Sequence, residues 1–320
     1  MKRAAKVWMI VAAVLIGIGA ILFVSVMAAN HWDFSAIANV HYETRTVAVD
    51  DAFTGISVRS DTADVMLVPS SDGKCRVELY ENEKVRHTVS VNDGVLTVGE
   101  NDTRKWFERI AFSFGSPKIT VYLPETAYET LLIRERTGDV QIPADFIFDS
   151  IDITANTGDV SCFASCSGSI AIRTDTGDIR IENGSAESLT LSVTTGEAGV
   201  RSFTCEKGID LTVTTGDAYL SDVTCESLTS TGDTGDITLR NVIASERISI
   251  ERDTGDVRFE KCDAGEINIE TDTGDVTGSL LSDKVFIAKS DIGDVNVPET
   301  TSGGKCRITT DTGDIRITIE

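Results

Sequence analysis

The C-terminal two thirds of the chain repeats one pattern of apolar and polar positions every 19 or 20 residues. Each repeat centres on a glycine, usually within Thr-Gly-Asp. An apolar residue stands two positions after that glycine and, except at Gly278, another stands four after it. The ten glycines are Gly138, Gly158, Gly177, Gly196, Gly216, Gly235, Gly255, Gly274, Gly293 and Gly313. Apolar residues at every second position predict a short β-strand with one buried face.

A second apolar pair precedes each glycine by seven and five positions, as Leu131 and Ile133 precede Gly138. Each repeat is therefore expected to hold two strands, a tight glycine corner and a looser turn, and a fixed period of this length indicates stacked coils. We predict an all-β chain in which residues 131–320 form a parallel β-solenoid of about ten coils, roughly 45 to 50 Å long. A third short face within the looser turn stays an open alternative.

The geometry of a tight corner explains the repeated Thr-Gly-Asp sequence. Glycine adopts positive φ values that other residues resist, and the aspartate after it can accept hydrogen bonds from N–H groups of the turn. An aspartate occupies that position in every coil but one, in which Glu197 replaces it. Because the carboxylate recurs throughout the array, none is singled out as catalytic.

Residues 41–130 are rich in predicted strands but irregular, and we expect them to cap the first coil. Thr62-Ala63-Asp64-Val65 resembles a degenerate corner, and Asn92-Asp93-Gly94 predicts a hairpin turn. The aromatic cluster of this region is expected in the core of the cap, with a partner or membrane-surface patch as the alternative. It consists of Trp106, Phe107, Phe112 and Phe114.

Residues 7–27 are an uncharged apolar run, long enough to cross about 30 Å of hydrocarbon as a helix. The basic residues 1–6 before it predict a cytoplasmic N-terminus, a single-pass cell-membrane protein, and an extracytoplasmic domain after a linker at 28–40. The alternative is a cleaved signal peptide, with Val26 and Ala28 before the cut, although such apolar regions are usually shorter.

The formal net charge of −22 makes nucleic acid a poor partner. The acidic residues are explained by the need to keep an elongated protein surface soluble. The alternative is that they form a cation-binding surface. The last five coils each carry a second aspartate two residues before the glycine, so that adjacent coils could supply oxygen ligands to calcium. The calcium candidates are Asp253, Asp256, Asp272, Asp275, Asp291, Asp294, Asp311 and Asp314. Turn N–H groups and nearby cations such as Arg252 or Lys289 are the competing explanation, and no other cofactor is expected.

The chain has seven cysteines, and an odd number does not indicate a framework of disulfide bonds. Their positions in inward columns and in the looser turn predict buried, stacked thiols. Adjacent coils could bring Cys205 and Cys225 within bonding range, which makes them the one disulfide to test.

A membrane segment followed by strands and tandem Thr-Gly-Asp-Val or Thr-Gly-Asp-Ile coils resembles the bacterial β-strand-repeat surface proteins known as the putative adhesin family, a domain of unknown function. The resemblance covers about residues 41–320 and implies no catalytic residues. Some relatives belong to envelope-stress systems, so the resemblance also allows such a role here.

Three functions compete. The first is non-catalytic adhesion or scaffolding in the cell envelope, with an unknown envelope protein or glycan as partner. The second is an envelope-stress sensor arm that relays through a membrane neighbour. The third, a polysaccharide-cleaving enzyme, is disfavoured because no carboxylate pair stands apart from the array and His31, His41 and His87 all precede it.

The C-terminal strand is expected to lie at one end of the solenoid. The chain ends seven residues after Gly313 on an alternating strand. It is expected to leave an open sheet edge there, either protected by outward charges or paired with a partner strand.

Overall fold

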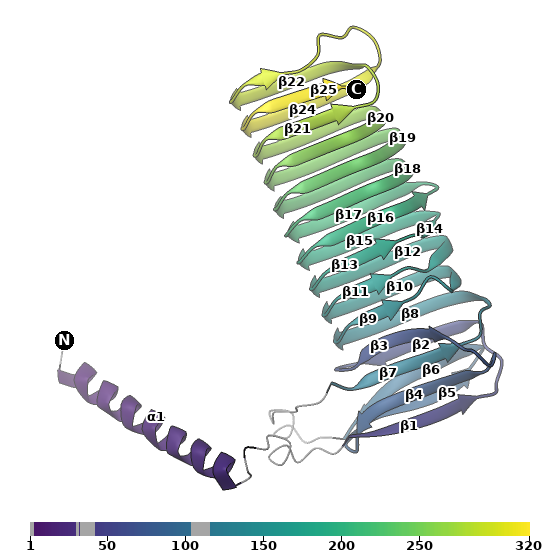
Figure 1. Ribbon diagram of the computed structural model, residues 1–320, viewed down its shortest axis with the longest axis vertical. Helices are drawn as coiled ribbons and strands as arrows, with labels where there is room; N and C mark the ends of the chain where they lie inside the picture. The colour runs from purple at the N-terminus through teal and green to yellow at the C-terminus, as the bar shows by residue number, and fades with distance from the viewer. Residues whose placement is uncertain (1–2, 30–31, 33–41, 104–115) are drawn as a thin grey trace.

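The computed structural model describes residues 3–29, 32, 42–103 and 116–320 (Figure 1). The apolar segment forms one helix, α1 (Arg3–Ala29). Within it, Trp8–Ala29 has a mean hydropathy of 2.8 and is long enough to cross a membrane. Except for Met27, the described side chains of this stretch contact little protein and are exposed. The predicted apolar helix is therefore confirmed, while the aromatic cluster around Trp106 lies outside the described residues.

The 25 strands of the described residues belong to one sheet that coils into a rod (Figure 1). The repeat region contains β8 (Ala127–Thr137), β9 (Val140–Ile142), β10 (Ile147–Thr157), β11 (Val160–Cys162), β12 (Ser165–Thr176), β13 (Ile179–Glu182), β14 (Ser185–Ala186), β15 (Ser188–Thr195), β16 (Ala198–Cys205), β17 (Gly208–Thr215), β18 (Ala218–Thr234), β19 (Ile237–Thr254), β20 (Val257–Thr273), β21 (Val276–Leu280), β22 (Lys284–Ile292), β23 (Val295–Asn296), β24 (Gly304–Thr312) and β25 (Ile315–Ile319). The all-β solenoid predicted from the repeat is confirmed.

Equivalent residues of neighbouring coils pair in parallel register. Val160 lies between Val140 and Ile179, and the same pairing brings Ile170 beside Ile151. The inward columns are almost completely buried from coil to coil, so they form one continuous apolar core. This stacking buries surface that a single coil could not cover by itself.

Two sets of inward positions lie beyond the predicted columns: one in the looser turn, which the open alternative of a third short face already allowed, and one that was missed from the sequence. The chain bends six residues after the corner glycine, where Ser202, Asp222 and Asn241 have positive φ values of 50°, 55° and 51°. The residues after this bend, such as Phe203 and Cys205, face inward and are buried, so the looser turn does contain a third short face. All seven cysteines are buried free thiols, including Cys205 and its expected partner Cys225.

The set that was missed is a column three residues before each corner glycine. Its residues are polar in several coils. Thr174 donates a hydrogen bond to the carbonyl of Gly158 at 3.3 Å, and Thr310 does the same to Gly274 at 3.2 Å. Arg252 occupies this column and is 1% exposed, so it lies in the core and is not a surface cation for the aspartates. The expectation that it balances their charge at the surface was wrong.

Glycine at the corner is required by both conformation and space. Gly216 has φ of 128°, and a Cβ built on it would lie 2.0 Å from the carbonyl oxygen of Gly196 in the neighbouring coil. Any larger residue would force the two coils apart, which explains why the repeat keeps this position free of side chains.

The base of the rod is a mixed parallel and antiparallel cap. Its strands are β1 (Tyr42–Val49), β2 (Gly55–Ser60), β3 (Asp64–Pro69), β4 (Cys75–Asn82), β5 (Val85–Asn92), β6 (Val95–Asp102) and β7 (Lys118–Leu123). Strands β2 and β3 pair in parallel with β8 and β9, so the degenerate corner does build a coil. Beyond it, β4 pairs antiparallel with β7 and β1 pairs antiparallel with β4. The hairpin of β5 and β6 turns at Asp93-Gly94 as predicted, with φ values of 50° and 76°.

At the distal end the coils do not stack in chain order. Strand β24 lies between β20 and β22, and β25 lies between β21 and β23. The last coil is thus inserted beneath the one that precedes it in sequence. The expected open edge is wrong for the first residues of the C-terminal strand, because Ile315 pairs with Val276 on one side and with Val295 on the other, whereas residues 317–319 pair with β21 alone.

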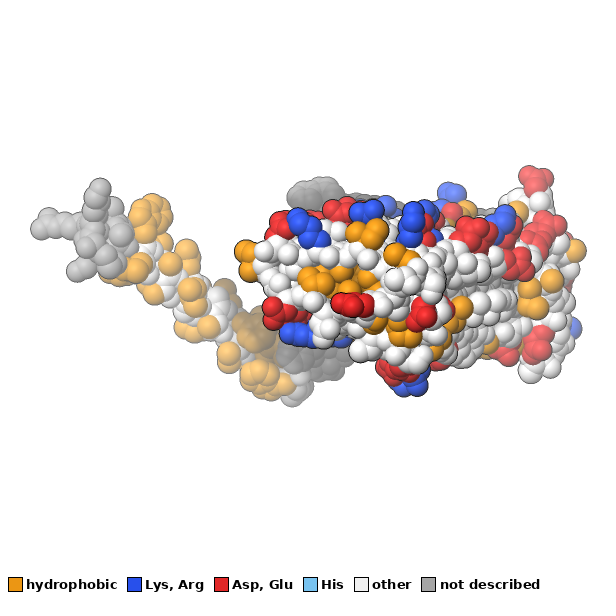
Figure 2. Space-filling view, turned by 90° about the horizontal axis from the view of Figure 1, so that it is seen from above, with side chains coloured by type: hydrophobic (Ala, Val, Ile, Leu, Met, Phe, Trp, Pro, Cys, Tyr) orange, Lys and Arg blue, Asp and Glu red, His pale blue; other side chains and the backbone are white. Residues whose placement is uncertain are grey.

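The outermost described coil is instead that of β22 and β23. Its apolar residues are only partly covered: Phe286 and Ala288 are half-buried against the core, while Ile292 is 70% exposed and Val295 44%. Figure 2 looks onto the rod from this end and shows apolar side chains gathered among charged ones. Most of the free sheet edge at this end of the rod therefore belongs to an internal segment of the chain, β22 and β23.

Candidate functional site

A row of carboxylates follows the glycine corners along the rod. In most pairs of neighbouring coils, Oδ1 of the lower aspartate accepts a hydrogen bond from the backbone N–H of the equivalent residue above. The donors and acceptors are Asp139 to Asp64 (3.2 Å), Asp159 to Asp139 (2.9 Å), Asp178 to Asp159 (2.9 Å), Glu197 to Asp178 (2.8 Å), Asp236 to Asp217 (2.8 Å), Asp256 to Asp236 (2.9 Å), Asp275 to Asp256 (3.0 Å), Asp314 to Asp275 (2.8 Å) and Asp294 to Asp314 (2.7 Å). We call this row the aspartate ladder. It gives the repeated aspartate a structural role.

The ladder engages the carboxylates of three of the eight calcium candidates. Asp256, Asp275 and Asp314 each commit one oxygen to it, and the N–H of Asp294 lowers the pKa of Asp314 by hydrogen bonding. Arg258 lies 2.7 Å from the second carboxylate oxygen of Asp256.

The outer candidates Asp253, Asp272, Asp291 and Asp311 stand exposed on the other side of each corner, and Lys289 pairs with Asp291 at 2.5 Å. Within the described ranges no three acidic, histidine or cysteine side chains are grouped as metal ligands. Calcium binding itself stays a prediction.

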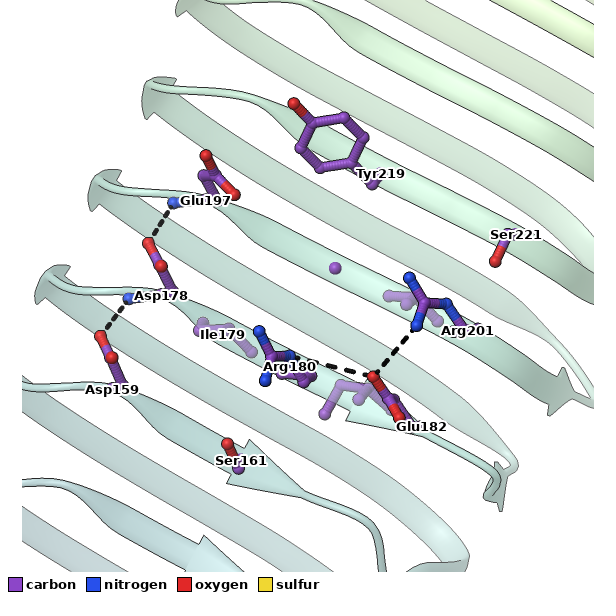
Figure 3. A pocket seen from close by; sticks show the side chains of 13 residues that line it. Asp159, Ser161, Asp178, Ile179, Arg180, Glu182, Glu197, Arg201, Tyr219 and Ser221 are labelled. Carbon is purple, nitrogen blue, oxygen red and sulfur yellow. Dashed lines mark hydrogen bonds and ion pairs between the residues drawn. The ribbon is translucent and has the colours of Figure 1, made fainter.

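The ladder is interrupted at one step. The backbone N–H of Glu197 bonds to Asp178 as elsewhere (Figure 3). Its own carboxylate, however, makes no bond to the N–H of Asp217 in the next coil. In the part of the chain that the structure describes, this carboxylate has no hydrogen-bond or ion-pair partner. At the one position where the side chain is longer by a methylene, the carboxylate therefore does not take part in the aspartate ladder.

Two more departures from the repeat lie beside Glu197. Three residues after the corner, the side chain points outward, and this outward column holds Arg180, Gly199 and Tyr219 in successive coils. The missing side chain at Gly199 leaves a recess of about 210 Å³ on the face formed by β11, β13, β16 and β18. Tyr219 is 42% exposed at its upper rim, and its ring is seen face-on in Figure 3. The lining of the recess comes from Asp159, Ser161, Asp178, Ile179, Arg180, Ile181, Glu182, Glu197, Gly199, Val200, Arg201, Tyr219 and Ser221. We call this feature the Gly199 recess.

Charged groups of both signs border the Gly199 recess. Arg180 and Arg201 share one carboxylate, Glu182, at 3.9 and 3.6 Å, and both guanidinium groups are about two thirds exposed. At the opposite rim the Tyr219 hydroxyl donates to Asp217 at 3.0 Å, and this hydrogen bond raises the pKa of Tyr219. Figure 3 shows the ladder carboxylates on one side of the recess and the arginines on the other.

The recess offers hydrogen-bond donors, acceptors and an aromatic surface, but no poised nucleophile. None of its lining residues is a histidine or a cysteine. It is also open on a flat face, whereas acid–base and nucleophilic chemistry in proteins generally relies on enclosed groups that exclude water. Its composition therefore suits reversible binding.

This site was not predicted from the sequence. Glu197 stood out in the sequence as the one exception to the aspartate column, but it was not connected with the residues around it. The signal that could have found the site is the clustering of exceptions, since Glu197, Gly199 and Tyr219 fall within two adjacent repeats.

The comparison with known families agrees with this architecture. The model of the Toastrack DUF4097 family matches residues 53–242 and 209–320. This chain belongs to the Toastrack DUF4097 family. A search of curated proteins finds no match.

Several solved structures resemble this Toastrack protein. One, described as a putative adhesin from Parabacteroides merdae, is 14% identical with a TM-score of 0.51, and the match covers 77% of this chain and 98% of that one. Another, described as a putative lipid binding protein from Parabacteroides distasonis, is 15% identical with a TM-score of 0.49 and covers 88% and 98%. A third, a putative adhesin from Bacteroides fragilis, is 16% identical with a TM-score of 0.46 and covers 87% and 97%. At this level of identity the first of these supports the fold alone.

Proposed function

We propose that this Toastrack protein is a membrane-anchored, non-catalytic binding protein of the cell envelope that serves in adhesion or as a scaffold. The observation that carries the proposal is the Gly199 recess, where the regular rod changes at three neighbouring positions to leave a free carboxylate, an open hollow and an exposed ring. Substitutions that served only the fold would be expected to preserve the ladder.

The rest of the molecule supports a presenting role. Helix α1 is long and apolar enough to anchor the chain, and the basic residues before it favour an orientation with the N-terminus in the cytoplasm. The coils then form a stiff support, because every coil pairs with its neighbours along the rod. A rigid face outside the membrane is suited to holding an envelope glycan or protein.

The test is cosedimentation of the full-length protein in nanodiscs with envelope fragments from the cells that express it. Gly199→Phe fills the recess and is expected to lower the bound fraction at least fivefold. The matched control is Thr277→Phe, in the same outward column four coils further along the rod and outside the lining of the recess. Equal binding by wild type and Gly199→Phe would refute the role of the recess.

The sensor alternative shares the binding step and adds a relay across the membrane. In this alternative the relay passes through a membrane partner. Crosslinking of the intact protein in its own membrane distinguishes the two functions, because only the sensor is expected to yield a constant membrane-protein partner.

A further inference from the structure

We propose that the Gly199 recess is a saccharide site that takes a neutral sugar ring against Tyr219, with Glu197 and the arginine pair bonding its hydroxyl groups. This inference rests on the proposed binding function and specifies the ligand class. Three features of the recess support it: the aromatic surface, the mixture of donors and acceptors, and the local charge.

Tyr219 supplies the apolar surface. It is the one exposed aromatic side chain on the coils from β8 to β25 among the described residues, and its position between Gly199 below and Thr238 above leaves its ring uncovered. The hydroxyl is tied to Asp217 at 3.0 Å, which fixes the orientation of the ring. An aromatic face with a tethered polar tip is suited to pack against the C–H face of a pyranose while its surroundings stay wet.

The polar groups of the recess can bond to hydroxyls in both senses. Glu197 offers carboxylate oxygens with no partner within the described chain, and carboxylates accept only. Arg180 and Arg201 donate only, and because they share Glu182 at distances beyond 3.5 Å, each retains N–H groups free to donate. A hydroxyl group both donates and accepts, so vicinal hydroxyls of a sugar match this arrangement better than a ligand that can do one alone.

Local charge argues for a neutral ligand. Asp159, Asp178, Glu182 and Glu197 line the recess together with two arginines, and the whole chain has a net charge of −22. An acidic saccharide or a phosphate would approach against this field. A cationic peptide would be attracted, but it would have to compete with the two guanidinium groups for the same carboxylates.

The experiment is isothermal titration of the full-length protein in nanodiscs. The probes are maltohexaose, cellohexaose and chitohexaose as neutral oligosaccharides, hexagalacturonate as an acidic one and a hexalysine peptide as a cation. At least one neutral probe is expected to bind, and hexagalacturonate at least tenfold more weakly. Tyr219→Leu should weaken that neutral binding about tenfold, and Tyr219→Phe, which keeps the ring, by threefold or less.

Glu197→Asp is the decisive variant because it restores the repeat. The shorter side chain is expected to accept the N–H of Asp217, as the other ladder aspartates do, so the thermal midpoint should stay the same or rise while saccharide affinity falls about tenfold. Folding failure is thereby separated from loss of the site.

Three outcomes would overturn the inference: tighter binding of hexalysine or hexagalacturonate than of every neutral probe, no binding of any neutral probe, or neutral binding unchanged in both Tyr219→Leu and Glu197→Asp. If no saccharide binds while Gly199→Phe still abolishes envelope binding, the ligand class is wrong and the proposed function stands.

Discussion

The aspartate ladder makes a quantitative prediction about two substitutions at the same repeat position. Asp139 and Glu197 both follow a corner glycine and both are exposed. Oδ1 of Asp139 accepts the N–H of Asp159 at 2.9 Å, whereas the carboxylate of Glu197 accepts nothing within the described chain. Replacing each with alanine therefore removes a ladder bond in one case and none in the other.

The expected difference follows from the character of the bond. A hydrogen bond to a charged group contributes about 1.5 to 3 kcal/mol to stability, and the exposed setting places Asp139 at the lower end because water can replace it. Removing one carboxylate also relieves repulsion from its neighbours, by about 0.5 kcal/mol after screening. Asp139→Ala should thus lower the free energy of unfolding by about 1 kcal/mol, whereas Glu197→Ala, which loses no ladder bond and gains the same relief, should leave it unchanged or raise it by up to about 0.5 kcal/mol.

Denaturant unfolding of the two variants beside wild type provides the measurement, with m-values compared to confirm that the same surface is exposed. Asp139→Asn is the matched control, because its amide oxygen can still accept the N–H of Asp159. If Glu197→Ala destabilised the protein as much as Asp139→Ala, the ladder would not be the reason for the repeated aspartate.

Three further predictions concern other parts of the rod. In a variant with Thr277→Cys and Arg316→Cys, oxidation should form a crosslink, since these outward residues pair at about 4.8 Å; Thr277→Cys with Asn296→Cys should not, because about 9.6 Å separates strands two coils apart. A crosslink in the second variant and none in the first would indicate that the coils stack in chain order. Burial raises the pKa of Glu135 to about 8, so wild-type stability should fall as pH rises from about 4.5 through 8, and Glu135→Gln should flatten that slope in pH-dependent melting. An unchanged slope would mean that Glu135 is solvated. Finally, if the outer and ladder aspartates share calcium, the melting midpoint should rise in millimolar Ca²⁺ relative to chelator, and no shift would exclude such a site.

The solenoid could be predicted because its information is repetitive and local. Period-2 apolar positions and a corner glycine recur in phase, so an error at one coil is corrected by the next. Even the degenerate corner at Ala63 was recognisable, and it stacks under Gly138 as its place in the pattern requires.

The coil order at the distal end was not predictable in the same way. The coils centred on Gly293 and Gly313 carry the same pattern, and pairing of either with the coil of Gly274 buries the same kinds of residues. Strand alternation cannot distinguish these arrangements. The structure places Gly313 next to Gly274, and the more exposed residues Ile292 and Val295 then lie in the outermost coil.

The recess was missed for a related reason. The aspartate column was interpreted from the residue that most coils share, so Glu197 was treated as a variant of that residue. The role of Glu197 depends on a backbone N–H one coil away, and the missing side chain at Gly199 becomes a recess only where Arg180 and Tyr219 of the adjacent coils flank it, so both features require the coils to be placed in register.

The most direct test of the binding role is site-specific photocrosslinking of the full-length protein in intact cells. A photoreactive residue is placed at Ser221, beside the recess, or at Thr190, which is exposed on the sheet of β15 at a similar height. We predict an envelope adduct from Ser221 that Gly199→Phe suppresses, and little or none from Thr190. Equal adducts from both positions, or an adduct from Thr190 alone, would contradict the claim that the protein binds its partner at the Gly199 recess.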